Sequence, residues 1–121
     1  MGILDSIKRF LRNKSDEEIK DFEDILFKKY GINRYLYSTS EGLPIMGNFE
    51  KNDELSARIP ETFKILSGIA YSNMYIVKSE DNTYLLLRVT PEVLLLAQLS
   101  KELSSREIME VAELTKSNLG I

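Results

Sequence analysis

Apolar residues recur with a helical period at the start of the chain. In residues 1–13 they fall on one face, opposite the basic residues. These apolar residues are Ile3, Leu4, Ile7, Phe10 and Leu11. A helix of this length is marginal alone in water, so it needs a surface to lie on. That surface is its own domain or a dimer partner in one interpretation, and a membrane or another protein in the other.

Two longer helices open with a capping-box pattern. In each, a serine is followed three residues later by a glutamate, which together satisfy backbone N–H groups of the first turn. A glycine follows the last turn of each and is expected to end it. The pattern predicts helices from residue 15 to 30 and from residue 104 or 105 to 119.

A further helical pattern runs from residue 54 toward residue 71, with Asp53 as its expected N-cap. Pro60 lies inside this pattern. Proline removes one helical hydrogen bond and clashes with the preceding turn, but it is tolerated in a first turn. We therefore expect either a kink or a main helix that begins at Pro60.

Strand patterns occupy two regions of the chain. The first is a hairpin whose polar turn ends at Gly42, which supplies a positive φ without steric cost. The second consists of three runs joined by short turns. Its last two runs are continuously apolar, so both faces of the sheet need cover from helices or from a partner. The predicted strands are residues 35–39, 43–46, 74–78, 84–89 and 93–99.

Together these elements predict an α+β fold with a five-stranded antiparallel sheet in an α/β/α sandwich. The order is helix, two strands, helix, three strands, helix, with an additional N-terminal amphipathic helix. Residues 1–14 are expected to form that extra helix, and residues 15–121 the domain. The short turns between the last three strands predict a meander.

Composition narrows the range of possible functions. The 121 residues include neither cysteine nor histidine, and no nucleotide-binding or catalytic motif is present. We therefore expect no catalytic residue, metal site or cofactor, and a protein that is not an enzyme. No apolar stretch is long enough to span a membrane. The expected location is the cytoplasm, with peripheral membrane attachment through residues 1–14 as an alternative.

Charge is distributed unevenly. The formal net charge is −3, but residues 1–14 carry four basic residues and one acidic residue, which gives 4 − 1 = +3. The rest of the chain therefore carries −6. An acidic domain disfavours non-specific binding to nucleic acid, so no nucleic-acid partner is expected.

The chain resembles the roadblock family, also called dynein-light-chain-like, which includes prokaryotic regulators of Ras-like small GTPases. Three segments carry this resemblance: the hairpin sequence Ser-Glu-Gly-Leu-Pro-Ile at residues 40–45, and the apolar strands at residues 84–89 and 93–97. The resemblance covers about residues 16–119. It contains no catalytic motif.

The resemblance implies a homodimer in which the middle helix and the neighbouring strand meet across a two-fold axis. It also implies a scaffold or regulator that binds a Ras-like small GTPase without supplying chemistry. The alternative is a profilin-like or PAS-like sensor domain that binds a small ligand. The implied dimer-interface candidates are Ile59, Phe63, Leu66, Tyr75 and Val77.

Overall fold

The computed structural model describes residues 2–121, so the first residue of the predicted N-terminal helix lies outside the described part. No helix within these residues has the length and apolar content needed to cross a bilayer. The elements are α1 (Ile3–Arg12), α2 (Asp16–Tyr30), β1 (Ile32–Thr39), β2 (Pro44–Gly47), α3 (Asn52–Ile69), β3 (Met74–Lys78), β4 (Thr83–Thr90), β5 (Val93–Leu99) and α4 (Ser105–Leu119).

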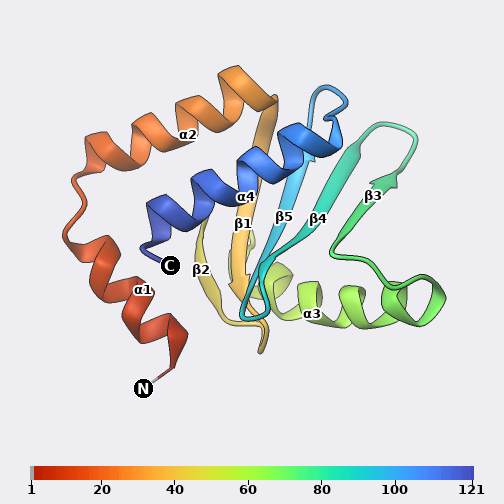
Figure 1. Ribbon diagram of the computed structural model, residues 1–121, viewed down its shortest axis with the longest axis horizontal. Coiled ribbons are helices and arrows are strands. Elements are labelled where there is room, and N and C mark those ends of the chain that lie inside the picture. The colour runs from red at the N-terminus through yellow and green to blue at the C-terminus, as the bar shows by residue number, and fades with distance from the viewer. Residues whose placement is uncertain (1) are drawn as a thin grey trace.

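The five strands of the described chain form one antiparallel sheet in the order β2-β1-β5-β4-β3. The predicted meander is confirmed, because β3, β4 and β5 are neighbours in space. Figure 1 shows α2 and α4 in front of the sheet, α3 behind it, and α1 beside β2. The predicted α/β/α sandwich is therefore correct. β1 begins earlier than predicted, because Ile32 already pairs with Leu99 of β5.

Alternate residues of the central strands enter two hydrophobic clusters, one on each face of the sheet. Leu95 and Ala97 of β5 belong to the cluster beneath α2 and α4. Their neighbour Leu94 joins Ile59 and Phe63 of α3 on the opposite face. Helices lie on both faces of the apolar strands as expected, because a strand points successive side chains to opposite sides.

Of the two alternatives expected at Pro60, a main helix that begins there is wrong. α3 starts at Asn52 and continues through Pro60. Ile59 and Phe63, which flank the proline, are each 3% exposed and pack against the sheet. Burying each of these side chains contributes about 1.5–3 kcal/mol, which offsets the roughly 3 kcal/mol cost of an interior proline.

Two helix caps also differ from the prediction. Lys51, and not Asp53, occupies the N-cap position of α3, and Asp53 lies in the first turn. At the start of α2, the Glu18 N–H donates to Ser15 Oγ at 3.1 Å as expected. The Glu18 carboxylate, however, pairs with Lys14 at 3.6 Å. The first capping box is therefore only half formed.

Candidate interaction surface

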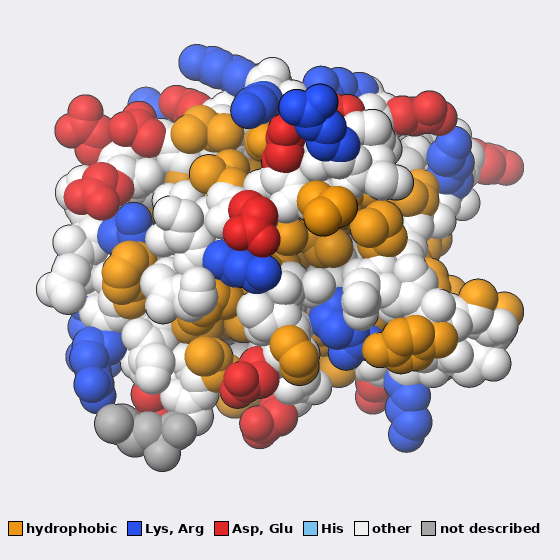
Figure 2. Space-filling view, in the orientation of Figure 1, with side chains coloured by type: hydrophobic (Ala, Val, Ile, Leu, Met, Phe, Trp, Pro, Cys, Tyr) orange, Lys and Arg blue, Asp and Glu red, His pale blue; other side chains and the backbone are white. Residues whose placement is uncertain are grey.

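The C-terminal end of α3 carries apolar side chains that the rest of the described chain leaves uncovered. Ile65 and Ile69 are one helical turn apart, and they are 67% and 81% exposed. Tyr71, which follows the helix, is 76% exposed. Figure 1 shows this end of α3 reaching past the β3 edge of the sheet, and Figure 2 shows apolar side chains gathered at the same lower right corner. Apolar patches of this kind mark interaction sites.

β3 forms one edge of the sheet and pairs only with β4 among the described strands. Its Ile76 and Val77 are 45% and 39% exposed, and as neighbours in a strand they point to opposite faces. The free side of an edge strand presents unpaired N–H and C=O groups. This edge can therefore accept a further strand.

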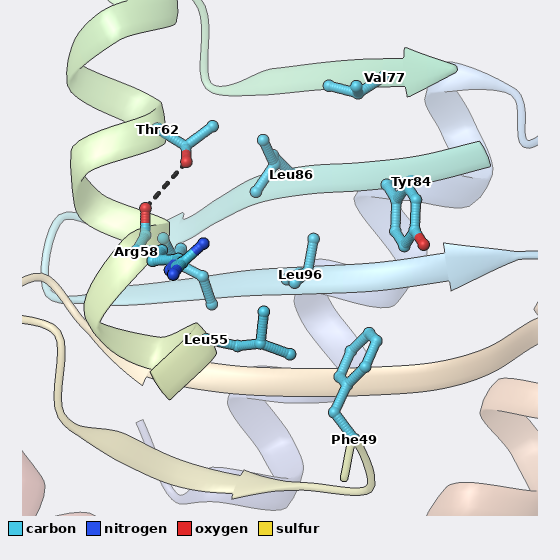
Figure 3. Close-up of a pocket in the computed structure, with 9 residues that line it drawn as sticks. Phe49, Leu55, Arg58, Thr62, Val77, Tyr84, Leu86 and Leu96 are labelled. Atoms are coloured by element: carbon cyan, nitrogen blue, oxygen red, sulfur yellow. Dashed lines mark hydrogen bonds between the residues drawn. The ribbon is translucent and has the colours of Figure 1, made fainter. Parts of the chain in front are cut away.

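An apolar groove of about 440 Å³ lies between α3 and the uncovered part of the sheet. Figure 3 shows Leu86 and Leu96 on its floor, Leu55 on the α3 side and Val77 at the open edge. The groove exists because α3 crosses the strands at one end, where it contacts β1, β2 and β5. Arg58 of α3 lies on its rim and supplies a positive charge there.

The segment between α3 and β3 is held by the hydroxyl of Tyr75. It donates to the Ala70 carbonyl at 2.6 Å and accepts from the Ser72 N–H at 3.0 Å. The Tyr75 ring also packs edge-on against Phe63, with 5.7 Å between ring centroids. These contacts fix the end of α3 relative to β3, so the exposed apolar side chains are presented in a defined position.

The five predicted interface residues occupy different environments. Ile59 and Phe63 are buried against their own sheet, whereas Leu66 and Tyr75 are half-buried. Val77 is the exposed member of the set. The first two therefore support the surface from beneath, and a role in a dimer stays a prediction for all five.

Sequence reasoning missed Ile65 and Ile69. The apolar period of this helix places Ile59 and Phe63 on its inward face. The sequence did hold a signal for them, because an apolar side chain on the outer face of a helix cannot enter the core of its own domain and so indicates an interaction surface.

The apolar face of α1 lies against the domain. Ile7 is fully buried in the cluster beneath α2 and α4, and α1 contacts α4 and β2. Ile3, Leu4 and Leu11 are half-buried, whereas Phe10 is 40% exposed. In this conformation the five residues proposed for a membrane or partner contact mostly face their own domain.

The buried tyrosines are structural groups. Burial, reinforced by a 2.7 Å hydrogen bond to Glu23, raises the pKa of Tyr35 above its ordinary value. Burial likewise raises the pKa of Tyr37. Both hydroxyls stay protonated at neutral pH and act as neutral hydrogen-bonding groups. Residues 2–121 contain no cluster of three acidic, histidine or cysteine side chains suited to a metal.

Comparison with known structures identifies the fold. MglB from Myxococcus xanthus superimposes with a TM-score of 0.67 at 12% identity, over 86% of this chain and 96% of that one. An MglB structure with a tetrameric arrangement gives 0.60 at 10% identity, over 84% and 90%. A roadblock/LC7 domain from Streptomyces avermitilis gives 0.57 at 14% identity, over 72% and 82%.

The architecture therefore defines a domain of the roadblock/LC7 fold class, as the sequence resemblance implied. No model of a protein family matches the chain. An uncharacterized protein from Archaeoglobus fulgidus is 32% identical over 115 residues, which span 93% of this chain and 68% of that protein. The chain belongs to the same family as this archaeal protein.

Proposed function

We propose that the protein is a non-enzymatic homodimer that binds a Ras-like small GTPase and modulates its nucleotide cycle or location. The observation that carries the proposal is an apolar surface at the β3 edge of the sheet. One protomer has an uncovered apolar helix end and an unfilled apolar groove at the same edge of its sheet. A two-fold interface requires such a surface to match itself.

The geometry of an antiparallel β3 pair brings these two features together. α3 ends close to Met74, the first residue of β3, whereas the groove opens beside Val77 near the other end of the strand. Antiparallel pairing places the first end of one β3 beside the second end of its copy. The exposed Ile65 and Ile69 of each protomer then lie over the groove of the other.

Gly68 supports a close approach of a second chain. It lies on the same side of α3 as Ile65 and Ile69, and a Cβ at this position would meet no atom within 4 Å. Glycine inside a helix costs about 0.5–1 kcal/mol relative to alanine. Packing within the protomer gives no reason for this cost, whereas a partner helix crossing at Gly68 does.

Binding of a GTPase is the function that the roadblock resemblance implies. A binding role is favoured over catalysis because the sequence has no histidine or cysteine and no catalytic motif. A continuous ten-stranded sheet with helices on both faces would offer a rigid platform larger than one protomer.

The test is to purify the protein and measure its binding to each Ras-like GTPase of its own organism, in the GDP-bound and GTP-bound states. GTP turnover is measured with and without the protein. We expect at least one GTPase to bind with a preference for one nucleotide state, or to change its turnover. Absence of binding to every GTPase in both states would refute the GTPase assignment.

The groove also favours a second candidate, a sensor domain that binds a small apolar ligand. Its volume of about 440 Å³ falls within the range of small-molecule sites. The two candidates differ in what occupies the groove. A ligand that copurifies with a monomer supports the sensor, whereas a ligand-free dimer supports the regulator; native mass spectrometry distinguishes them.

A further inference from the structure

We propose that the outward face of α1 attaches the protein to the surface of an anionic lipid bilayer. This goes beyond the proposed binding of a GTPase. The partner is a phospholipid surface, and the contact is electrostatic.

The outward face of α1 is basic. Lys8, Arg9 and Arg12 are exposed there, together with the single acid Asp5. Lys8 and Arg12 form no salt bridge within residues 2–121. Figure 2 shows basic side chains at the left of the molecule, where α1 lies in Figure 1. The charge of +3 on residues 1–14 contrasts with −6 on the remainder, so an anionic surface is attracted to α1 in particular.

The structure favours a contact at the bilayer surface over insertion of α1 into the bilayer. Ile7, at the centre of the apolar face, is fully buried in the protein core. The apolar face is therefore already occupied, and the basic face is the one available. Phe10 at the flank of α1 is 40% exposed, but its ring packs over Gly120, so the contact with the bilayer is carried by the basic side chains.

The proposed dimer leaves this contact to each protomer separately. α1 lies beside β2, at the edge of the sheet opposite β3 (Figure 1). A two-fold axis that pairs antiparallel β3 edges runs perpendicular to the sheet, so it places the two α1 helices at opposite ends of the dimer with their outward faces pointing apart. Each α1 therefore makes its own contact with an anionic surface.

The experiment is co-sedimentation of the full-length protein with phosphatidylcholine vesicles that either contain or lack phosphatidylserine. Lys8→Gln is compared with Lys51→Gln, an exposed lysine at the start of α3 on the opposite face of the sheet. Each Lys or Arg near an anionic surface strengthens binding by roughly fivefold. Lys8→Gln removes one charge from each contact, so we expect roughly a fivefold loss of affinity for anionic vesicles.

Lys51→Gln is expected to change the affinity by less than about twofold, and raised salt to weaken the binding of the wild-type protein. Three results would overturn the proposal: no preference for phosphatidylserine, an equal loss in both variants, or Lys8-dependent binding to duplex DNA without binding to vesicles. Light scattering on the same samples reports the dimer separately. A dimer that ignores vesicles overturns this inference alone, whereas a monomer that binds them overturns the proposed dimer alone.

Discussion

The Tyr37 hydroxyl donates a 2.6 Å hydrogen bond to the Thr115 hydroxyl and thereby joins β1 to α4 inside the core. The direction follows from a second bond, because Thr115 uses its own proton to donate to the Val111 carbonyl at 2.8 Å. Both side chains are fully buried. The pair fixes α4 over the sheet without a charged group.

Replacing Thr115 by valine is expected to lower the free energy of unfolding by about 1–3 kcal/mol, because it leaves the buried Tyr37 hydroxyl without an acceptor. Tyr37→Phe removes the donor and leaves Thr115 bonded to Val111, so we expect a smaller loss of about 1 kcal/mol. Urea unfolding of the two variants checks this order. A larger loss in Tyr37→Phe would contradict the assigned direction.

Gly120 ends α4 with a φ of 71° and lies beneath the ring of Phe10. A Cβ at Gly120 would come within 2.6 Å of that ring, so Gly120→Ala meets both backbone strain and a steric clash. We expect a loss of about 1–3 kcal/mol in thermal or urea unfolding. In a Phe10→Ala background the clash is absent, and the additional loss from Gly120→Ala is expected to fall to the backbone strain alone.

Because α1 is docked through its apolar face, substitutions on its two faces are expected to affect stability to different extents. Ile7→Glu is expected to lower the free energy of unfolding by at least about 2 kcal/mol, because it removes a buried aliphatic side chain. Lys8→Glu, on the exposed face, is expected to change it by less than about 0.5 kcal/mol. Hydrogen exchange provides a second measurement, in which Ile7→Glu removes protection along α1. Unchanged protection would contradict the observed docking.

The capping box of α4 makes stability depend on pH. The pKa of the Glu107 carboxyl lies below its ordinary value of 4.5, chiefly because the carboxylate accepts a hydrogen bond from the Ser104 N–H at 3.1 Å. Because the pKa is lower in the folded state than in the unfolded state, the ionised carboxylate stabilises the folded protein at pH values above the ordinary pKa. This stabilisation is lost as the pH falls through the folded-state pKa.

Glu107→Gln is therefore expected to lose less stability than the wild type between about pH 5 and pH 3. The matched control is Glu113→Gln on the same helix, where the carboxylate accepts from the Lys116 side chain. Chemical unfolding at several pH values measures the difference. Parallel pH profiles for wild type and Glu107→Gln would contradict the prediction.

Much of the fold was predictable because its signals are local. Caps such as Ser104 and the turn at Gly42, which has a φ of 91°, act on neighbouring residues only. The continuity of α3 through Pro60 was not predictable, because the packing of Ile59 and Phe63 against distant strands decides it. The sequence shows that a proline destabilises the helix, but it does not show the tertiary packing that offsets this destabilisation.

The candidate surface was less predictable than the fold. The resemblance pointed to α3 and β3, which carry the uncovered apolar side chains, but its candidates include Phe63, which faces inward. The exposure of Ile69 depends on how far α3 extends past the sheet, which no local pattern encodes. For α1 the sequence left two surfaces open, and burial of Ile7 in the core places its apolar face on its own domain.

The measurement that tests the central claim most directly is the solution mass of the protein and of two matched variants. Ile69→Asp introduces a charge at the exposed end of α3, whereas Met109→Asp does so at an exposed position of α4, where 65% of the side chain is accessible. Neither side chain is part of the core, so both variants are expected to fold. Multi-angle light scattering is expected to give twice the chain mass for wild type and Met109→Asp, and the mass of one chain for Ile69→Asp. A dimeric Ile69→Asp, or a monomeric wild type, would contradict the account.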